Sequence, residues 1–203
     1  MVELLAKGGW VMYSILGCSI VALAIVIERA VVFLRAVNDD GALIEAVEEA
    51  LRSGSVEGAL RVCERSRGPV REVLRSCLGE WAAGHERMAD AANYTGNRVV
   101  EALDKRLRGL SIIAQTTPLL GLLGTVLGMI RTFMRIEELG GAVNASALAG
   151  GIWEALLTTA FGLAVAIPCV FMYHWFEARV ARYASLIRDS AERLVTLRKG
   201  GRA

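Results

Sequence analysis

A few side chains that can bind protons or cations lie inside stretches that are otherwise apolar. Glu154 lies in the segment GGIWEALLTTAFGLAVAIPCVF at residues 150–171, and Thr158 and Thr159 follow it about one helical turn later. Thr125 lies in an earlier stretch of the same kind. A carboxylate at hydrocarbon depth costs several kcal/mol unless it meets water, a partner or a proton. These residues therefore predict a water-bearing cavity lined by Glu154, Thr158 or Thr159, and Thr125.

A plainer interpretation of these side chains stays open. Glu154 lies close to one end of its apolar run, where it would reach the water outside a membrane. A threonine hydroxyl also returns to the carbonyl one turn back in its own helix. Against this, the polar and small residues of the earlier run recur at spacings of four, four, three and four, so they share one helical face. They are Thr117, Gly121, Thr125, Gly128 and Thr132. This face adds Thr117 to the candidate lining of an ion pathway.

Glycines of the same apolar run suit helix packing. Gly124 and Gly128 form a GxxxG pair that Gly121 precedes by one turn, which gives a membrane helix a ridge that a neighbour approaches closely. We expect Gly124 and Gly128 to serve packing and assembly. Pro118 and Pro168 each leave a backbone carbonyl without its helical partner, so they either bend their helices or take part in the pathway.

Motifs for catalysis are missing from the sequence. The glycine-rich GLLGTVLG at 121–128 lacks the Lys-Ser/Thr pair of a phosphate-binding loop, and no HExxH or GxSxG occurs. The four cysteines and two histidines form no CxxC or Cys/His cluster. We therefore predict no enzyme, no metal site and no resident cofactor, and we expect reduced, buried cysteines.

The apolar runs are long enough to cross a membrane. The chain has 203 residues, of which 54% are hydrophobic, and its mean hydropathy is +0.44. Charges are almost missing from residues 10–27, 110–130 and 155–173, and each run approaches the roughly 20 residues that a spanning helix needs. The first run also has features of a signal peptide, but its small-residue triplet lies in mid-run, so we expect an uncleaved span.

The distribution of basic residues predicts the orientation. Seven basic residues against three acidic ones follow residue 176, whereas the short loop after the second run carries Glu137 and Glu138 and no basic residue. Arg131 and Arg135 argue weakly the other way. We expect a periplasmic N-terminus and a cytoplasmic tail, and the net charge of +2 gives no indication of nucleic-acid binding.

Together these patterns predict an all-α membrane protein with three transmembrane helices, the second and third extended into a cytoplasmic helical bundle. The expected layout is a short periplasmic N-terminus (1–9), transmembrane helix 1 (10–34), a cytoplasmic helical segment (35–109), transmembrane helix 2 (110–136), a short periplasmic loop (137–147), transmembrane helix 3 (148–176) and a basic cytoplasmic tail (177–203). The helical pattern continues unbroken through residues 91–135, which predicts a rod on the order of 65 Å long. Short helices kinked at Gly109 and Pro118 are the alternative.

Capping residues predict shorter helices within residues 35–109. The Asn38-Asp39-Asp40 run begins a helix to about Arg52, Ser55 caps a second that ends near Gly68, and Pro69 suits the first turn of a third. Two apolar stripes at helical spacing are expected to be buried. They are Val99, Leu103, Leu107 and Leu110 in the first, and Phe176, Val180, Tyr183, Ile187 and Leu194 in the second.

Three segments resemble the MotA/TolQ/ExbB proton-channel family in its ExbB and TolQ branch. They are TTPLLGLLGTVLGMIRTF (116–133), GGIWEALLTTAFGLAVAIPCVFMYHWF (150–176) and IERAVVFLRA (27–36). By this resemblance, Thr125, Glu154 and Thr159 match the pore-facing Thr, Glu and Thr of the family, and Pro118 and Pro168 match its span prolines. Trp153 departs from the pattern by replacing a small residue, and Thr158 adds a hydroxyl.

The resemblance implies an energy-transducing complex in the inner membrane of a Gram-negative bacterium. A homopentamer of an ExbB-like subunit would surround two copies of a single-span partner, ExbD or TolR. Proton entry would move that partner, and a TonB-like or TolA-like protein would pass the work to the outer membrane, powering active transport there. The acid protonated in each cycle belongs to the partner, so this chain supplies the channel wall. The translocated ion is H⁺, with Na⁺ left open.

Three hypotheses follow for the function. The first is the ExbB-like proton-channel subunit, with a TolQ-like subunit of the Tol-Pal envelope system as its alternative. The second is a passive membrane scaffold whose glycines and long helices only organise partners. The third, a small-molecule transporter, is disfavoured because three spans leave little room for a substrate site.

Overall fold

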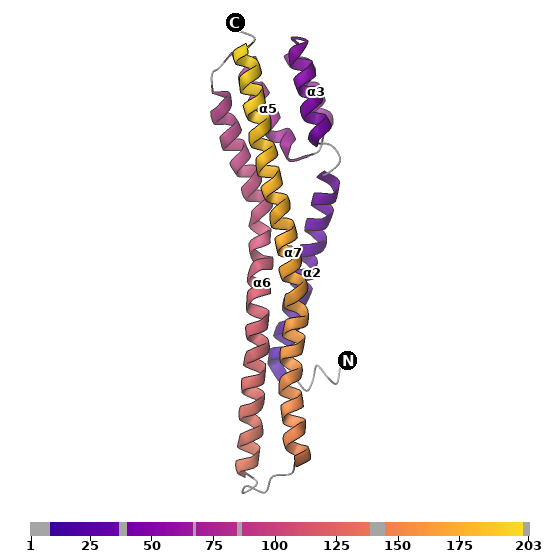
Figure 1. The fold of residues 1–203 in the computed structure, drawn as a ribbon, viewed down its shortest axis with the longest axis vertical. Coiled ribbons are helices and arrows are strands. Elements are labelled where there is room, and N and C mark those ends of the chain that lie inside the picture. The colour runs from indigo at the N-terminus through magenta and orange to yellow at the C-terminus, as the bar shows by residue number, and fades with distance from the viewer. Residues whose placement is uncertain (1–8, 37–39, 67, 85–86, 139–144, 201–203) are drawn as a thin grey trace. The chain divides into compact units, whose positions relative to one another are not determined.

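The computed structural model describes residues 9–36, 40–66, 68–84, 87–138 and 145–200, and the regular elements in these ranges are all α-helices (Figure 1). They are α2 (Gly9–Ala36), α3 (Asp40–Arg52), α4 (Val56–Arg65), α5 (Val70–Ala82), α6 (Met88–Glu138) and α7 (Ala145–Gly200). This confirms the all-helical fold class.

Within the described residues, α2, α6 and α7 are long and apolar enough to cross a membrane. Helix α6 has 51 residues and α7 has 56, more than twice the roughly 20 that a bilayer requires. Pro118 lies inside α6 and Pro168 inside α7, and neither interrupts its helix. The predicted long rods are therefore confirmed, and the alternative of separate short helices is wrong.

The chain divides into two compact units. Unit 1 comprises Met1–Ile27 and Leu107–His174, and unit 2 comprises Glu28–Arg106 and Trp175–Ala203. Each of the three long helices contributes one part to each unit.

Unit 1 buries apolar side chains from alanine up to leucine and methionine where α2, α6 and α7 meet, and it turns many other large apolar side chains outward. Its buried residues include Val11, Met12, Ile15, Ala22, Leu110, Ile113, Ala114, Ala155, Ala166 and Cys169. Its exposed residues include Ile20, Leu119, Leu122, Val126, Ile130, Trp153, Leu156, Ile167 and Phe171. An apolar exterior of this kind is expected of helices whose surroundings are lipid or other apolar helices.

Unit 2 differs in that its core contains aromatic rings. The Phe33 ring stacks on Phe176 at 5.5 Å between centroids and on Tyr183 at 6.0 Å. Helices α3, α4 and α5 add Leu43, Val47, Ala59, Cys63, Val73, Leu74, Cys77 and Leu78, which are all buried. Every residue of the two predicted apolar stripes is buried in its own unit, so both stripes are confirmed.

Helix boundaries in unit 2 follow the capping residues. The Ser55 hydroxyl accepts a hydrogen bond from the Gly58 amide at 3.0 Å, which confirms it as the cap of α4. Helix α3 ends at Arg52 as expected, while Asn38 and Asp39 lie outside the described residues.

The predicted end of the second short helix near Gly68 is wrong. Helix α4 stops at Arg65, because Ser66 adopts an extended conformation with its amide bonded to the Cys63 carbonyl. Pro69 disfavours a helical conformation in the residue before it, so the chain leaves the helix early. Pro69 itself precedes α5 as its N-cap, one position before the predicted first turn.

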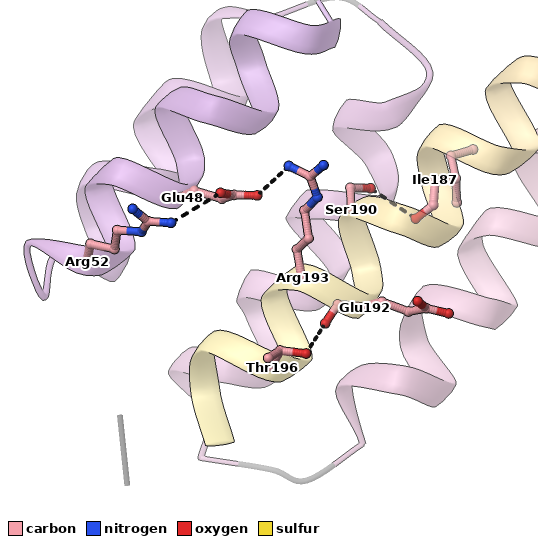
Figure 2. A network of polar contacts seen from close by, with 7 residues as sticks. All are labelled: Glu48, Arg52, Ile187, Ser190, Glu192, Arg193 and Thr196. Atoms are coloured by element: carbon pink, nitrogen blue, oxygen red, sulfur yellow. Dashed lines mark hydrogen bonds and ion pairs between the residues drawn. The ribbon is translucent and has the colours of Figure 1, made fainter. Parts of the chain in front are cut away.

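Polar contacts join the helices of unit 2. Arg29 of α2 is 5% exposed and donates to the Leu103 carbonyl of α6 at 3.2 Å, and Glu28 pairs with Arg106. On α3, the Glu48 carboxylate lies 3.8 Å from Arg52 and 3.4 Å from Arg193 of α7 (Figure 2).

The four cysteines are free thiols, three of them buried and Cys18 half-buried. Desolvation by burial raises the pKa of Cys63 and of Cys77 to about 11. Both thiols therefore stay protonated near neutral pH, and a protonated buried thiol is a poor nucleophile.

Candidate functional site

The glycine ridge of α6 packs against α7 in unit 1. A Cβ atom at Gly124 would lie 2.8 Å from the Cβ of Thr158, and one at Gly128 would lie 2.9 Å from the Cβ of Ala155. Helix α7 contributes a glycine of its own, because a Cβ at Gly162 would lie 2.9 Å from the Thr117 carbonyl oxygen. The two backbones approach so closely that a larger side chain at these positions would displace the neighbour.

The threonines of unit 1 direct their hydroxyl hydrogens to backbone carbonyls. Thr117 donates to Ile113 at 2.6 Å and Thr125 donates to Leu122 at 2.6 Å, each within α6. Thr158, which is 2% exposed, donates to Ala155 at 2.7 Å within α7.

Thr159 forms a hydrogen bond across the contact. Its hydroxyl donates to the Gly121 carbonyl of α6 at 3.0 Å. A Cβ atom at Gly121 would lie 3.0 Å from the Thr159 Cα, so the glycine allows the approach that the hydrogen bond needs. Thr159 therefore contributes to the helix contact directly.

Glu154 lines a small recess in unit 1. The recess has a volume of about 20 Å³, close to the room that one water molecule requires. Its lining comes from α2, α6 and α7 and consists of Trp10, Val11, Gly124, Leu127, Gly128, Arg131, Glu154, Ala155 and Thr158. Glu154 is half-buried, and the hydrogen bonds and ion pairs found among the described residues do not include its carboxylate. A carboxylate beside a water-sized space among apolar helices is a candidate functional group.

The predicted pathway residues do not all line the recess. Glu154 and Thr158 share the recess, whereas Thr125 and Thr159 are absent from its lining. Five residues separate Glu154 from Thr159, which is about 140° around an α-helix. Thr117 is fully buried between α6 and α7. The recess of a single chain thus does not bring Glu154, Thr159 and Thr125 together, and a pathway role for these residues stays a prediction.

Sequence reasoning missed two parts of the recess. The sequence analysis considered Arg131 only as a charge that bears on orientation, yet Arg131 lines the recess together with Glu154. Its spacing of three from Gly128 and seven from Gly124 places it on the ridge side of α6, which is a signal that the sequence carries. Trp10 and Val11 had no comparable signal, because their place depends on how α2 packs.

Comparison with known proteins gives a match over the centre of the chain. The model of the family described as the MotA/TolQ/ExbB proton channel family matches residues 65–189. This range contains α5, α6 and most of α7.

Individual relatives agree with this match. An ExbB-like biopolymer transport protein of Synechocystis is 30% identical over 184 residues, which cover 90% of this chain and 87% of that protein. The biopolymer transport protein ExbB of Salmonella typhimurium is 32% identical over 124 residues, or 59% of this chain and 50% of that protein. The Tol-Pal system protein TolQ of Haemophilus influenzae is 42% identical over 92 residues, or 44% of this chain and 39% of that protein. The chain also spans 63% of the length of an ExbB homolog of the archaeon Methanothermobacter thermautotrophicus.

Proposed function

This chain belongs to the MotA/TolQ/ExbB proton channel family, whose members are channels and not enzymes, and we propose that it is the ExbB-like channel subunit of an energy-transducing membrane complex. In this proposal, homo-oligomers of the chain, pentamers by resemblance to the family, surround a single-span ExbD-like partner. Ion entry moves the partner, and a TonB-type protein passes the work to the outer membrane to power active transport.

The Glu154 carboxylate in its recess carries the proposal. A scaffold has no use for an acid among apolar helices, where its charge costs several kcal/mol. One proton crossing a membrane supplies about 2.3 kcal/mol per 100 mV, so a few protons supply enough free energy for a mechanical step. Thr125 and Thr159 would complete the path where neighbouring copies and the partner span meet.

Replacement of the acid tests the proposal. Glu154→Gln keeps the size of the side chain and removes its charge, so the variant should assemble normally and lose at least nine tenths of proton uptake by liposomes that contain the purified complex. Glu137→Gln is the matched control, since Glu137 is exposed near the end of α6 and lies outside the recess. Full uptake by the Glu154→Gln complex would leave the passive scaffold as the better hypothesis.

A TolQ-like role in a Tol-Pal system is the second candidate. The 42% identity to TolQ over 92 residues supports it, whereas the ExbB-like relative matches far more of the chain. The neighbouring reading frames discriminate between them. We expect a short frame with one apolar span that carries an Asp, next to a TonB-type frame. A TolA-type frame in its place would favour the Tol-Pal system.

We also propose that the chain lies in the inner membrane of a Gram-negative cell with its N-terminus outside. The basic tail after residue 176 supports this orientation. Alkaline phosphatase, which is active only outside the cytoplasm, should be active when fused to the N-terminus and inactive when fused to the C-terminus. The reverse pattern would overturn the orientation.

A further inference from the structure

We propose that copies of this chain meet in unit 2 head to tail, with an exposed face of α6 from one copy against an exposed face of α7 from the next. The inference deepens the proposed function and rests on its homo-oligomer, because it assigns one contact between neighbouring copies. The α6 face consists of Asp90, Tyr94, Arg98 and Glu101, and the α7 face consists of Arg182, Asp189 and Arg193, all of them exposed. The spacings of four, four and three on α6, and of seven and four on α7, put each set on one side of its helix.

The two faces point away from the contact between α6 and α7 within their own chain. That contact passes through Gly96, where a Cβ atom would lie 2.9 Å from Cγ2 of Ile187. Tyr94 and Asp189 each lie two residues from this contact, which is about 200° around an α-helix. The faces therefore lie on opposite sides of the helix pair, where two different copies can reach them.

The antiparallel course of α6 and α7 puts residues of the two faces at matching heights. Gly96 lies beside Ile187, and Arg198 near the end of α7 lies 5.9 Å from the ring centroid of Trp81, shortly before α6 begins. Both helices rise by about 1.5 Å per residue, so positions equally far from Gly96 and from Ile187, toward opposite chain ends, lie at the same height. The pairs at equal height are Asp90 with Arg193, Tyr94 with Asp189, and Glu101 with Arg182.

The charges of the two faces are complementary at these heights. The first and the last pair each join a carboxylate to a guanidinium. The middle pair gains a cation from Arg98, whose guanidinium carbon lies 5.8 Å from the Tyr94 ring centroid and so comes to the height of Asp189. Copies in one membrane share one depth, so opposite charges meet when the faces do, and such complementarity fixes the register of an interface. Two different faces on opposite sides of one chain make a head-to-tail contact, which a rotation closes into a ring.

A groove beside the α7 face has room for the aromatic side chain of the α6 face. The groove has a volume of about 500 Å³ and is lined by Glu48 and Arg52 of α3 and by residues of α7 that include Asp189 and Arg193 (Figure 2). Tyr94 is 67% exposed in the single chain, although its ring is large and apolar over most of its surface. Tyrosine and arginine are enriched among the residues that carry most of the binding energy of interfaces. Insertion of Tyr94 into the groove of the next copy would bury this ring and bring Arg98 beside Asp189.

Disulfide cross-linking tests the contact on the chain in its own membrane. Copies that carry Tyr94→Cys and copies that carry Asp189→Cys, each with its own tag, are produced together and oxidised with copper phenanthroline. We expect a covalent dimer that carries both tags, since the new thiols are at exposed positions and the native thiols are buried or half-buried. Ala178→Cys in place of Asp189→Cys is the control, because Ala178 is exposed on α7 eleven residues earlier, about 16 Å away along the helix.

Two outcomes would overturn the inference. The first is a mixed dimer no more abundant than in the Ala178→Cys control. The second is a stronger cross-link of Tyr94→Cys copies with one another, which would indicate a two-fold contact and not a head-to-tail one. Both outcomes leave the proposed channel function standing, because proton uptake is measured separately. If the wild-type complex carries no protons, the channel function fails, and the cross-link still decides whether copies meet through these faces.

A charge exchange tests the register of the contact. Asp189→Arg alone sets two guanidinium groups at one height and should lower the melting temperature of the purified complex. Adding Arg98→Asp should recover at least half of this decrease. No decrease in the single variant, or no recovery in the double variant, would contradict the pairing of Arg98 with Asp189 of the next copy.

Discussion

Helices α6 and α7 pack by two different means in the two units. In unit 1 they meet through glycine, alanine and threonine, with backbone atoms close enough for Thr159 to bond the Gly121 carbonyl. In unit 2, α6 buries Val99 and Leu103, and α7 buries the aromatic rings of Phe176 and Tyr183.

The difference follows from the proposed surroundings, which are lipid for unit 1 and water for unit 2. Lipid is as apolar as leucine, so membrane helices gain little by burying large apolar side chains and depend on close backbone approach and hydrogen bonds. In water the hydrophobic effect rewards the burial of large side chains. The sequence of a single helix thus changes its packing chemistry where its surroundings change.

The largest effect is expected at Gly162, where the closest neighbour is backbone. A leucine there would push against the Thr117 carbonyl and the Gly121 Cα, and neither can turn away. Gly162→Leu should therefore separate the two helices and prevent native assembly on a native gel. Gly150→Leu is the control, since, apart from its chain neighbours and its own helix backbone, no described atom lies within 4 Å of a Cβ at Gly150. An intact oligomer of Gly162→Leu would contradict close packing in unit 1.

The next effect is expected in the core of unit 2. Phe176 is fully buried and stacked on Phe33, so Phe176→Ala should cost about 3–5 kcal/mol in thermal unfolding followed by circular dichroism. Phe171→Ala removes the same ring five residues earlier on α7, from a side chain that is 72% exposed. Equal losses of unfolding free energy in the two variants would show that the buried ring of Phe176 contributes no more to stability than an exposed ring.

A smaller effect is expected for the hydrogen bond between the helices. Thr159→Val keeps the shape of the side chain and removes its donor to Gly121, at a cost of about 0.6 kcal/mol. Thr125→Val removes a hydroxyl that bonds within its own helix and should cost less in the same unfolding measurement. A larger loss of unfolding free energy for Thr125→Val would contradict the conclusion that the Thr159 hydroxyl contributes more to stability.

The smallest effect is expected at the ion pairs of unit 2. Arg193 is 61% exposed at its side chain and lies 3.4 Å from Glu48. Arg193→Ala should lower stability by at most about 1 kcal/mol, and the difference from wild type should vanish in 1 M salt, which screens exposed charges within about 3 Å. The exposed Arg188 of the same helix supplies the control substitution. A loss that persists in high salt would indicate packing by the arginine stem.

Local patterns in the sequence were sufficient to predict the helices and their buried faces. The stripe from Phe176 to Leu194 and the Ser55 cap depend on neighbours within a few residues, which periodicity and capping rules describe. The recess depends on how three helices meet. The sequence identified Glu154 by its cost in an apolar run, but only the packed helices bring Arg131 and Trp10 beside it.

The direction of one hydrogen bond has a consequence for proton conduction. The Thr125 hydroxyl has given its hydrogen to the Leu122 carbonyl, so it offers only lone pairs to any molecule that approaches. A chain of proton hops through this oxygen would have to break that bond at every passage. Thr125 is better suited to steady a hydronium ion or to orient a water than to relay the proton itself.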